Sequence, residues 1–296
     1  MIRQVLISKS YNPYFNLALE EYLVRNSDFS QKQILLIYRN NPSIILGKNQ
    51  NIYKEVHIDF ILNETIPIAR RISGGGTVVH DLGNINFSFF NPYHLKQVNS
   101  YQHSTGFMVD CINHLGVLCE MNERNAIILY NDKKISGSAQ FSCSNGILSH
   151  FSLLYDSDLN RIEEAIKKNN FKIESKASAS VRSKIDNLSH HLTLSKEAFI
   201  QEIIGFWEAT HIDFIDESTY EALDELVINK YSSTSFIYDT AGAATLIFEN
   251  GNIELEQGKI KSTTFDVNAE QYIGKRLIYS EIEKDDIFWK HLNDTK

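Results

Sequence analysis

Apolar residues recur along this chain with the period of helices in some stretches and in short β-branched runs in others. A period near 3.6 residues predicts an amphipathic helix. From Tyr14 to Arg25 the apolar residues fall on one face, and Glu20 and Glu21 fall elsewhere. Further helices are predicted over 100–121, from a cap at Asp158 to about 168, from a cap at Ser195 to about 210, and over 218–228.

Short apolar runs bounded by Gly, Asn and Pro predict the strands. The runs 34–38 and 43–46 flank Arg39-Asn40-Asn41-Pro42, a composition typical of a hairpin loop. Helices and strands alternate without a regular βαβ repeat, so we expect an α+β fold with mixed or antiparallel sheets and packed helices. The other strands in this part are predicted over 66–71, 77–80, 84–90, 126–130, 134–142 and 146–155.

The pattern changes after residue 235, where short strands with tight Gly turns follow one another. We predict a catalytic domain at 1–235 and a small C-terminal α/β accessory domain at 240–296. A unit this short is near the lower limit for an independent core, so we expect it to dock on the larger one. Its strands are predicted over 244–249, 252–256 and 259–267.

Composition excludes several classes of protein. The 296 residues are 43% hydrophobic and 22% charged, which is typical of a globular protein. A net charge of -8 argues against a nucleic-acid-binding surface. The first residues are too polar for a signal peptide and no 18-residue apolar run offers a membrane span, so we expect a cytoplasmic protein without a membrane partner. Three cysteines without metal-like spacing predict neither disulfides nor a zinc site.

One segment, residues 70–81, carries candidate chemistry and reads RRISGGGTVVHD. Three glycines let backbone N–H groups approach a ligand closely. The arginine pair and Ser73 suit phosphate or carboxylate oxygens. The segment lies between predicted strands rather than opening a helix, and it lacks the GxxxxGK[ST] pattern of a P-loop. On these residues alone, a flexible loop with surface arginines is an equally good interpretation.

A second segment, residues 134–139, reads KISGSA. Its small residues leave room for a ligand against the backbone, and Lys134 would place a compact positive charge beside that ligand. By itself this pattern also fits a solvated lysine at the end of a hairpin.

Taken in this order, the two segments resemble the lipoate-protein ligase family of the biotin/lipoate ligase superfamily, with its pattern R-R-x-S-G-G-G-x-V-x-H-D-x-G-N followed by K-x-S-G-x-A. The resemblance extends to 16–21, 42–50 and 180–183, and so covers about residues 10–190. It implies an enzyme that uses ATP and Mg²⁺ to convert lipoate to lipoyl-AMP. The lipoyl group then passes to a lysine of a lipoyl carrier domain, from the acyl-carrying subunit of a 2-oxoacid dehydrogenase or from the glycine cleavage H protein.

The resemblance also implies residue roles. Lys134 would be catalytic, because a fixed ammonium can stabilise charge that develops on the phosphate and acyl oxygens. Lipoate or lipoyl-AMP would be bound by Arg71, Ser73, Gly74, Gly75, Gly76, His80, Ser136, Gly137, Ala139 and His150. The nucleotide would be bound by Thr77, Val79, Asp81, Asn84, Asn125 and Lys134, and no metal ligand is assigned.

Several of these residues have structural alternatives. His80 is either a base near the acceptor amine or a hydrogen-bonded structural group. Asp81 and Asn84 fit turn capping as well as nucleotide binding. Arg70 is expected to face outward, because neighbours on a strand alternate between faces.

The chain departs from the family pattern at two positions. Where the family reads G-R-N-D, this chain reads ERNA over 123–126, so Ala126 replaces a carboxylate. This substitution is expected to weaken the handling of ATP and magnesium, because alanine cannot bind the metal. Phe151 stands where glycine is common, and its ring is expected either to narrow the acyl pocket or to move the strand.

These departures leave three alternatives to the ligase. A lipoyl or octanoyl transferase would move the acyl group between carriers through a thioester on Cys143, although no base is evident beside that residue. A second kind of transferase would use preformed lipoyl-AMP. A non-catalytic lipoate-binding protein would bind tightly without turnover. Biotin ligase is disfavoured, because the chain lacks a G-R-G-R-x-x-R stretch.

Overall fold

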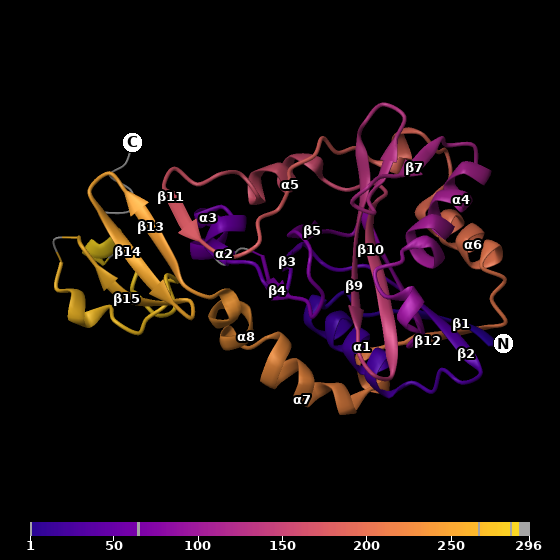
Figure 1. Cartoon of the computed structure of the whole chain (residues 1–296), viewed down its shortest axis with the longest axis horizontal. Coiled ribbons are helices and arrows are strands. Elements are labelled where there is room, and N and C mark those ends of the chain that lie inside the picture. The colour runs from indigo at the N-terminus through magenta and orange to yellow at the C-terminus, as the bar shows by residue number, and fades with distance from the viewer. Residues whose placement is uncertain (1, 64–65, 266, 285, 290–296) are drawn as a thin grey trace.

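The computed structural model describes residues 2–63, 66–265, 267–284 and 286–289. Figure 1 shows a large sheet at one end of the molecule and a C-terminal sheet at the other, with helical segments α7 and α8 connecting them. Within the described ranges, no helix is long and apolar enough to cross a membrane.

The large sheet has eight strands in the order β12-β1-β2-β6-β10-β9-β8-β7. Strand β1 pairs in parallel with β2 and β12, and the other neighbours are antiparallel, which confirms the expected mixed sheet in an α+β fold. The strands are β1 (Ile2–Ser8), β2 (Lys32–Tyr38), β6 (Asn84–Pro92), β7 (Cys119–Met121), β8 (Ile127–Leu129), β9 (Lys134–Ser142), β10 (Gly146–Leu154) and β12 (His211–Ile215).

Helices cover both faces of this sheet. Because side chains alternate along a strand, Ile34 and Leu36 of β2 pack with α1 (Pro13–Asn26), whereas Leu35 and Ile37 pack with α4 (Phe107–His114) and α6 (Lys196–Phe206). The predicted caps are confirmed. Ser195 accepts a hydrogen bond from the first turn of α6, and Asp158 does the same for α5 (Leu159–Ala165).

A separate three-stranded sheet carries the glycine segment. Strand β3 (Ser43–Leu46) lies between β4 (Ile68–Arg70), to which it is parallel, and β5 (Val78–His80), to which it is antiparallel. The predicted hairpin of 34–38 with 43–46 is therefore wrong, because β2 pairs with β1 and β6 instead. The three glycines connect the two strands that flank β3, and the short helices α2 (Ile52–Glu55) and α3 (Ile58–Asn63) follow β3.

Two predicted helices are shorter than expected. The 100–121 prediction contains a π-helical turn at Gln102–Gly106, then α4, then β7, because the chain reverses at Gly116 with φ +90°. The 218–228 prediction breaks into turns that wind beside α1 and bury Leu223 and Tyr231 in its core. These are 3₁₀ turns at Glu217–Thr219 and Glu221–Leu223, α7 (Asp224–Leu226), a π-helical turn at Val227–Tyr231, and α8 (Thr234–Tyr238).

The C-terminal sheet has four antiparallel strands in the order β11-β13-β14-β15. Strands β13 (Ala244–Phe248) and β14 (Gly251–Glu256) match the predicted ones to within a residue, and β11 (Lys172–Ser175) pairs with β13. Strand β15 (Lys259–Thr263) begins as predicted but ends four residues early, and residue 266 of that prediction lies outside the described residues. Tyr53 of α2 packs in the same core as Leu246 and Leu255. The domain division at 235–240 stays a prediction, and both the strand pairing and the core cross it.

Candidate active site

Two adjoining cavities lie between the large sheet, the glycine segment and residues 178–183. The first encloses about 430 Å³ and the second about 660 Å³. Lys134 borders both, so its side chain stands where the cavities meet. The other residues shared by the two linings are Thr77, Val78, Gly137, Ser152, Ser180, Val181 and Ser183.

Most of the predicted site residues border these cavities. The first is lined by Arg71, Gly75, Gly76, Thr77, His80, Lys134, Gly137, Ala139 and His150, and the second adds Val79 and Ser136. Ser73, Gly74, Asp81, Asn84 and Asn125 border neither. Asp81 accepts hydrogen bonds from the backbone of Gly83, Asn84 and Asp158, so its contacts are those of the capping alternative. The nucleotide role of Asp81, Asn84 and Asn125 stays a prediction.

Arg71 shapes the glycine segment from within. Its Nη2 donates to the carbonyl oxygens of Gly74 at 2.6 Å and Gly76 at 2.7 Å, and its Nη1 donates to Ile45. Burial lowers the pKa of Arg71 to about 10, which leaves the guanidinium charged at neutral pH. Gly75 has φ +89°, and a Cβ there would meet Arg71 Nη2 at 2.9 Å. This position therefore requires glycine.

A buried hydrogen-bonded chain continues from Arg71. Arg71 Nε donates to Ser73 Oγ at 3.0 Å, Ser73 Oγ lies 2.6 Å from His150 Nε2, and His150 Nδ1 lies 3.0 Å from both carboxylate oxygens of Glu20. Because Nδ1 faces a carboxylate, we assign the ring proton to Nδ1 and a donor role to the Ser73 hydroxyl. Tyr38 and Ser88 also donate to Glu20.

Ser73, His150 and Glu20 are connected in the order of a catalytic Ser-His-acid triad. The Ser73 hydroxyl, however, is not accessible to a substrate. Ser73 is 1% exposed, borders neither cavity and already accepts a bond from Arg71. The hydrogen-bonded series from Arg71 to Glu20 is therefore a structural link that fixes the glycine segment against β10. The sequence prediction that Glu20 and Glu21 lie off the packed face of α1 is wrong, since they are 1% and 5% exposed. Residues 16–21, which read NLALEE and belong to the resemblance to the family, include Glu20 and were the sequence signal that could have indicated its role.

Arg70 faces away from the cavities, as strand alternation predicts, but it is not at the surface. It is fully buried and donates to backbone carbonyls of Gly47 and Gln50 at 2.9 and 2.7 Å, and to Phe236 and Ile237 at the end of α8. The outward-facing prediction is wrong because α8 covers that side of β4. Arg70 thus connects α8, which precedes strand β13, to the loop after β3, whose Gly47 lies next to Gly75.

His80 accepts a hydrogen bond in a structural contact. Asn40 Nδ2 lies 2.9 Å from His80 Nδ1, and because an amide nitrogen donates, the ring proton belongs on Nε2. Burial, with the charge of Arg71 and the ring of His150 nearby, lowers the pKa of His80 to about 3. A ring that remains neutral down to that pH is a weak base. This geometry favours the structural alternative over the base.

Lys134 is the first residue of β9, and its backbone is held on both sides. Its N–H donates to Lys184 O at 2.8 Å, and its carbonyl accepts from the N–H of Asp186. Burial, then the charges of Arg124 and Arg71, lowers the pKa of Lys134. A Cβ at Gly137 would lie 3.1 Å from Lys134 Nζ, so glycine leaves room for the ammonium. Within the described residues, no carboxylate pairs with Lys134.

Ser180 ties residues 178–183 to the glycine segment. Its hydroxyl accepts from the N–H of Thr77 at 2.9 Å and from Gln50 Nε2 at 3.0 Å, and it donates to the buried Glu55 carboxylate. A Cβ at Gly76 would meet Ser180 Oγ at 3.0 Å. Gln50 and Ser180 lie in segments that resemble the family, but the sequence predicted no role for them. Glu55 lies outside those segments and was not predicted.

Ala126, the first departure from the family pattern, lies at the candidate site. Ala126 borders the first cavity, and no Asp or Glu is among the described residues that line it. Nowhere in the described ranges do three or more His, Cys, Asp or Glu side chains form a metal-binding group. Glu163 and Glu164 line the second cavity, and both are exposed. The residues present therefore do not form a resident magnesium site.

Phe151 and Cys143 differ in their positions relative to the cavities. The Phe151 ring stacks on Phe87 at 5.5 Å and on Phe89 at 6.0 Å in the core beneath the helices, and Phe151 also borders the first cavity, so the narrowing of an acyl pocket by this residue stays a prediction. Cys143 follows the far end of β9 from Lys134, contacts the carbonyls of Val24 and Gly146 at 3.6 Å, and borders neither cavity. A thioester on Cys143 is not supported by this position.

The fold and the lysine between two cavities are those of an α+β domain with a candidate active site, and comparison with known proteins identifies the family. Residues 12–207 match the family model of the lipoyl protein ligase A/B catalytic domain. The chain therefore belongs to the lipoate-protein ligase family.

Similar proteins include lipoate-protein ligase LplJ of Bacillus subtilis, which is 41% identical over 61% of this chain and 54% of its own length. The chain thus spans only about half of that relative. A solved structure of a bi-partite lipoate protein ligase and its E2 lipoyl domain from Thermoplasma acidophilum is 25% identical, covering 80% of this chain and 95% of that one, with a TM-score of 0.66. A lipoate-protein ligase A bound with ATP is 26% identical, covering 79% and 97%, with a TM-score of 0.65.

Proposed function

We propose that this protein is an ATP-dependent lipoate-protein ligase. The observation that carries the proposal is the ammonium of Lys134 at the junction of two cavities, without a carboxylate partner among the described residues. Each cavity has a volume suited to a small ligand. A cation at their junction would neutralise charge that develops where the two ligands react.

In the first half-reaction, a carboxylate oxygen of lipoate attacks the α-phosphorus of ATP. The bond from that phosphorus to the bridging oxygen breaks, and pyrophosphate leaves with the electron pair. We assign the acyl chain to the first cavity, which Ala139 and His150 line, and the adenosine to the second, which Val79 lines. Lys134 then faces the oxygens of the new mixed anhydride, where its charge stabilises the transition state.

In the second half-reaction, the unprotonated ε-amine of a carrier lysine attacks the acyl carbon, the amide forms, and AMP leaves. The carriers we propose are a lipoyl domain of a 2-oxoacid dehydrogenase acyl-carrying subunit and the glycine cleavage H protein. The similar archaeal ligase was studied with an E2 lipoyl domain. Magnesium would enter with the phosphates of ATP, and no step is assigned to it here. The cytoplasmic location stays a prediction of the sequence.

A second candidate is a transferase that uses preformed lipoyl-AMP. Ala126 favours it, because the family pattern has a carboxylate at this position and the chain has alanine. This candidate retains Lys134 and the second half-reaction, and it lacks the first.

The test incubates the protein with lipoate, ATP and Mg²⁺, with and without an apo lipoyl domain, beside a Lys134→Ala variant. Pyrophosphate release and a mass increase of the carrier that need ATP and vanish in the variant support the ligase. Carrier modification only with supplied lipoyl-AMP supports the transferase. Tight lipoate binding without either product would leave the non-catalytic binding protein.

A further inference from the structure

We propose that a basic rim beside Lys134 is the docking surface for an acidic carrier domain. The rim consists of Tyr130, Val181, Arg182 and Lys184. This inference rests on the proposed function, because it names the surface through which that function would select its protein substrate.

The rim lies next to the catalytic lysine. Lys184 O accepts the backbone N–H of Lys134 at 2.8 Å, so Lys184 is its direct neighbour across a backbone pair. Tyr130 lies in the turn between β8 and β9, and that turn leads into Lys134. Val181 lines both cavities and Arg182 lines the second. A protein that delivers its lysine to this junction would contact these side chains.

The charge of this region is opposite to that of the whole chain. The chain carries a net charge of -8, yet the four rim residues include two basic residues, Arg182 and Lys184, and no acidic one. Within the described residues, Arg182 and Lys184 form no ion pair, and both are exposed. Unpaired surface cations attract an acidic protein and orient it as it approaches.

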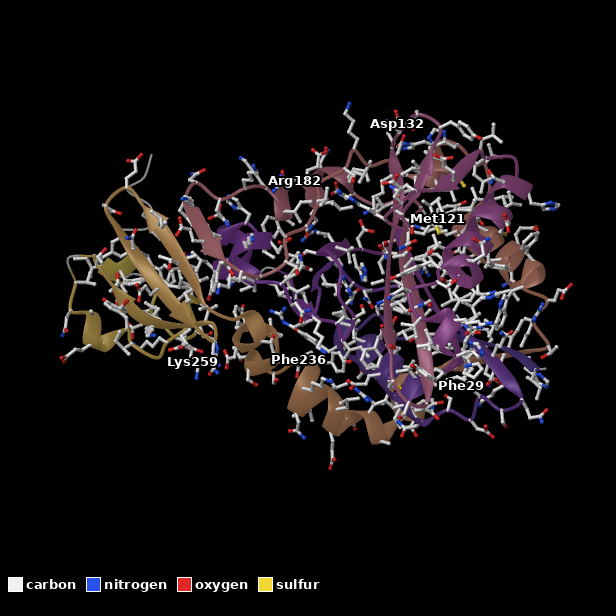
Figure 2. All side chains as sticks on the ribbon, in the orientation of Figure 1. Phe29, Met121, Asp132, Arg182, Phe236 and Lys259 are labelled. Carbon is white, nitrogen blue, oxygen red and sulfur yellow. The ribbon has the colours of Figure 1, made fainter. Side chains whose placement is uncertain are left out.

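The rim also offers apolar anchors. Tyr130 is 74% exposed and Val181 is 60% exposed, although both are large apolar side chains. Tyrosine and arginine are enriched where binding energy concentrates in protein interfaces. Figure 2 shows Arg182 and the hairpin tip at Asp132 on the same edge of the molecule, while Lys259 lies in the C-terminal sheet. Asp132 at that tip is acidic and would repel an acidic carrier. The attraction of the carrier therefore comes from Arg182 and Lys184.

Bound nucleotide does not account for the whole rim. Lys184 and Tyr130 border neither cavity, and their exposed side chains face solvent. Their charge and ring are therefore available to an object larger than the nucleotide. A protein domain with carboxylates around its acceptor lysine fits that requirement.

The experiment separates docking from chemistry by using two acceptors of the activated acyl group. Hydroxylamine reports adenylate formation without a docking surface, and an apo lipoyl domain with acidic residues around its acceptor lysine reports docking as well. The variants are Lys184→Glu and Tyr130→Ala. The matched control is Lys259→Glu, which makes the same charge change in β15.

We expect Lys184→Glu to raise the KM for the carrier about tenfold, equivalent to about 1.4 kcal/mol, with hydroxamate formation unchanged. The salt dependence of carrier lipoylation should also become shallower, because a screened attraction has been removed. Lys259→Glu should match the wild type in both assays. Replacing one carrier carboxylate near the acceptor lysine with lysine should restore part of the lost rate with Lys184→Glu.

The proposal is overturned if both variants lipoylate the carrier with the wild-type KM, or if hydroxamate formation falls by the same factor as carrier lipoylation. Failure of the proposed function has a different signature, since the wild-type protein would then form no hydroxamate from lipoate and ATP. Melting temperatures of the variants establish that each one is folded.

Discussion

His150 Nε2 lies 2.6 Å from the hydroxyl oxygen of Ser73, and this contact joins the glycine segment to the central strand β10. Glu20 orients the ring from its other side, and Arg71 binds the same hydroxyl. The four side chains are at least nine-tenths buried. Buried hydrogen bonds among these four side chains therefore fix the glycine segment, while the backbone of that segment borders the first cavity.

If Ser73 is a structural link, its loss should impair binding without abolishing chemistry. We expect Ser73→Ala to raise the KM for lipoate about tenfold, because a lost buried hydrogen bond costs about 1 kcal/mol and the segment it holds is loosened. Steady-state kinetics of hydroxamate formation check this, with Ser30→Ala at an exposed loop as the control. A nucleophilic Ser73 would instead give a covalent acyl adduct in the intact mass of the wild type and no turnover in the variant.

Lys134 should limit activity at alkaline pH. The rate depends on its ammonium, and burial together with Arg124 and Arg71 lowers its pKa. The adenylation rate should therefore fall as the pH rises through a value below the ordinary pKa of about 10.4. Arg124→Ala removes one of the repelling charges, so the alkaline limb should move to higher pH. Arg124→Lys keeps the charge and should leave the limb in place.

The pH profile of pyrophosphate release measures this prediction. An unchanged alkaline limb in Arg124→Ala would show that another group controls it. The Lys134→Ala variant should lose about a hundredfold or more in rate, which is the usual effect of removing a charge-stabilising donor. It should melt no lower than the wild type, since a partly buried cation repelled by the charges of Arg124 and Arg71 is removed.

Arg70 should be a stability residue and not a catalytic one. In Arg70→Ala, the carbonyls of Gly47, Gln50 and Ile237 lose their donor in a buried place, so we expect a loss of about 3 kcal/mol or more in the free energy of unfolding. Urea denaturation provides the measurement. Arg25→Ala removes a half-exposed partner of the buried Glu21, which keeps its hydrogen bonds from Lys230 and Tyr231, so the loss should be less than about 1 kcal/mol. Equal losses in the two variants would contradict the role of Arg70.

Sequence motifs predicted the members of the site better than their contacts. Segments 70–81 and 134–139 supplied most of the predicted residues that line the first cavity, because backbone-exposing glycines and a lysine have few other uses in that order. Glu20, Glu55 and Asn40 were missed, because each acts through a partner distant in sequence. A motif cannot show that Glu20 faces His150, 130 residues away.

The fold errors have the same origin. The run 34–46 has the local chemistry of a hairpin, but its two strands pair with different partners, and only tertiary packing decides that. Arg70 was expected at the surface because alternation predicts the side of a strand and not what covers it. β11 joined the C-terminal sheet without a local signal, since its pairing with β13 spans many residues.

Acid should destabilise the protein partly through His80. Its folded pKa of about 3 lies below its ordinary value of 6.5, so the unfolded chain binds this proton first as the pH falls. The contribution of His80 to stability is then complete above about pH 6.5 and declines toward pH 3, by up to about 1.4 kcal/mol per pH unit. His80→Gln should flatten the pH dependence of the unfolding free energy between about pH 6.5 and pH 4.5. His211→Gln, at an exposed position, should keep the wild-type slope. Urea titrations across this range decide the matter, because a wild-type slope in His80→Gln would mean that His80 is protonated as readily in the folded protein as in the unfolded chain.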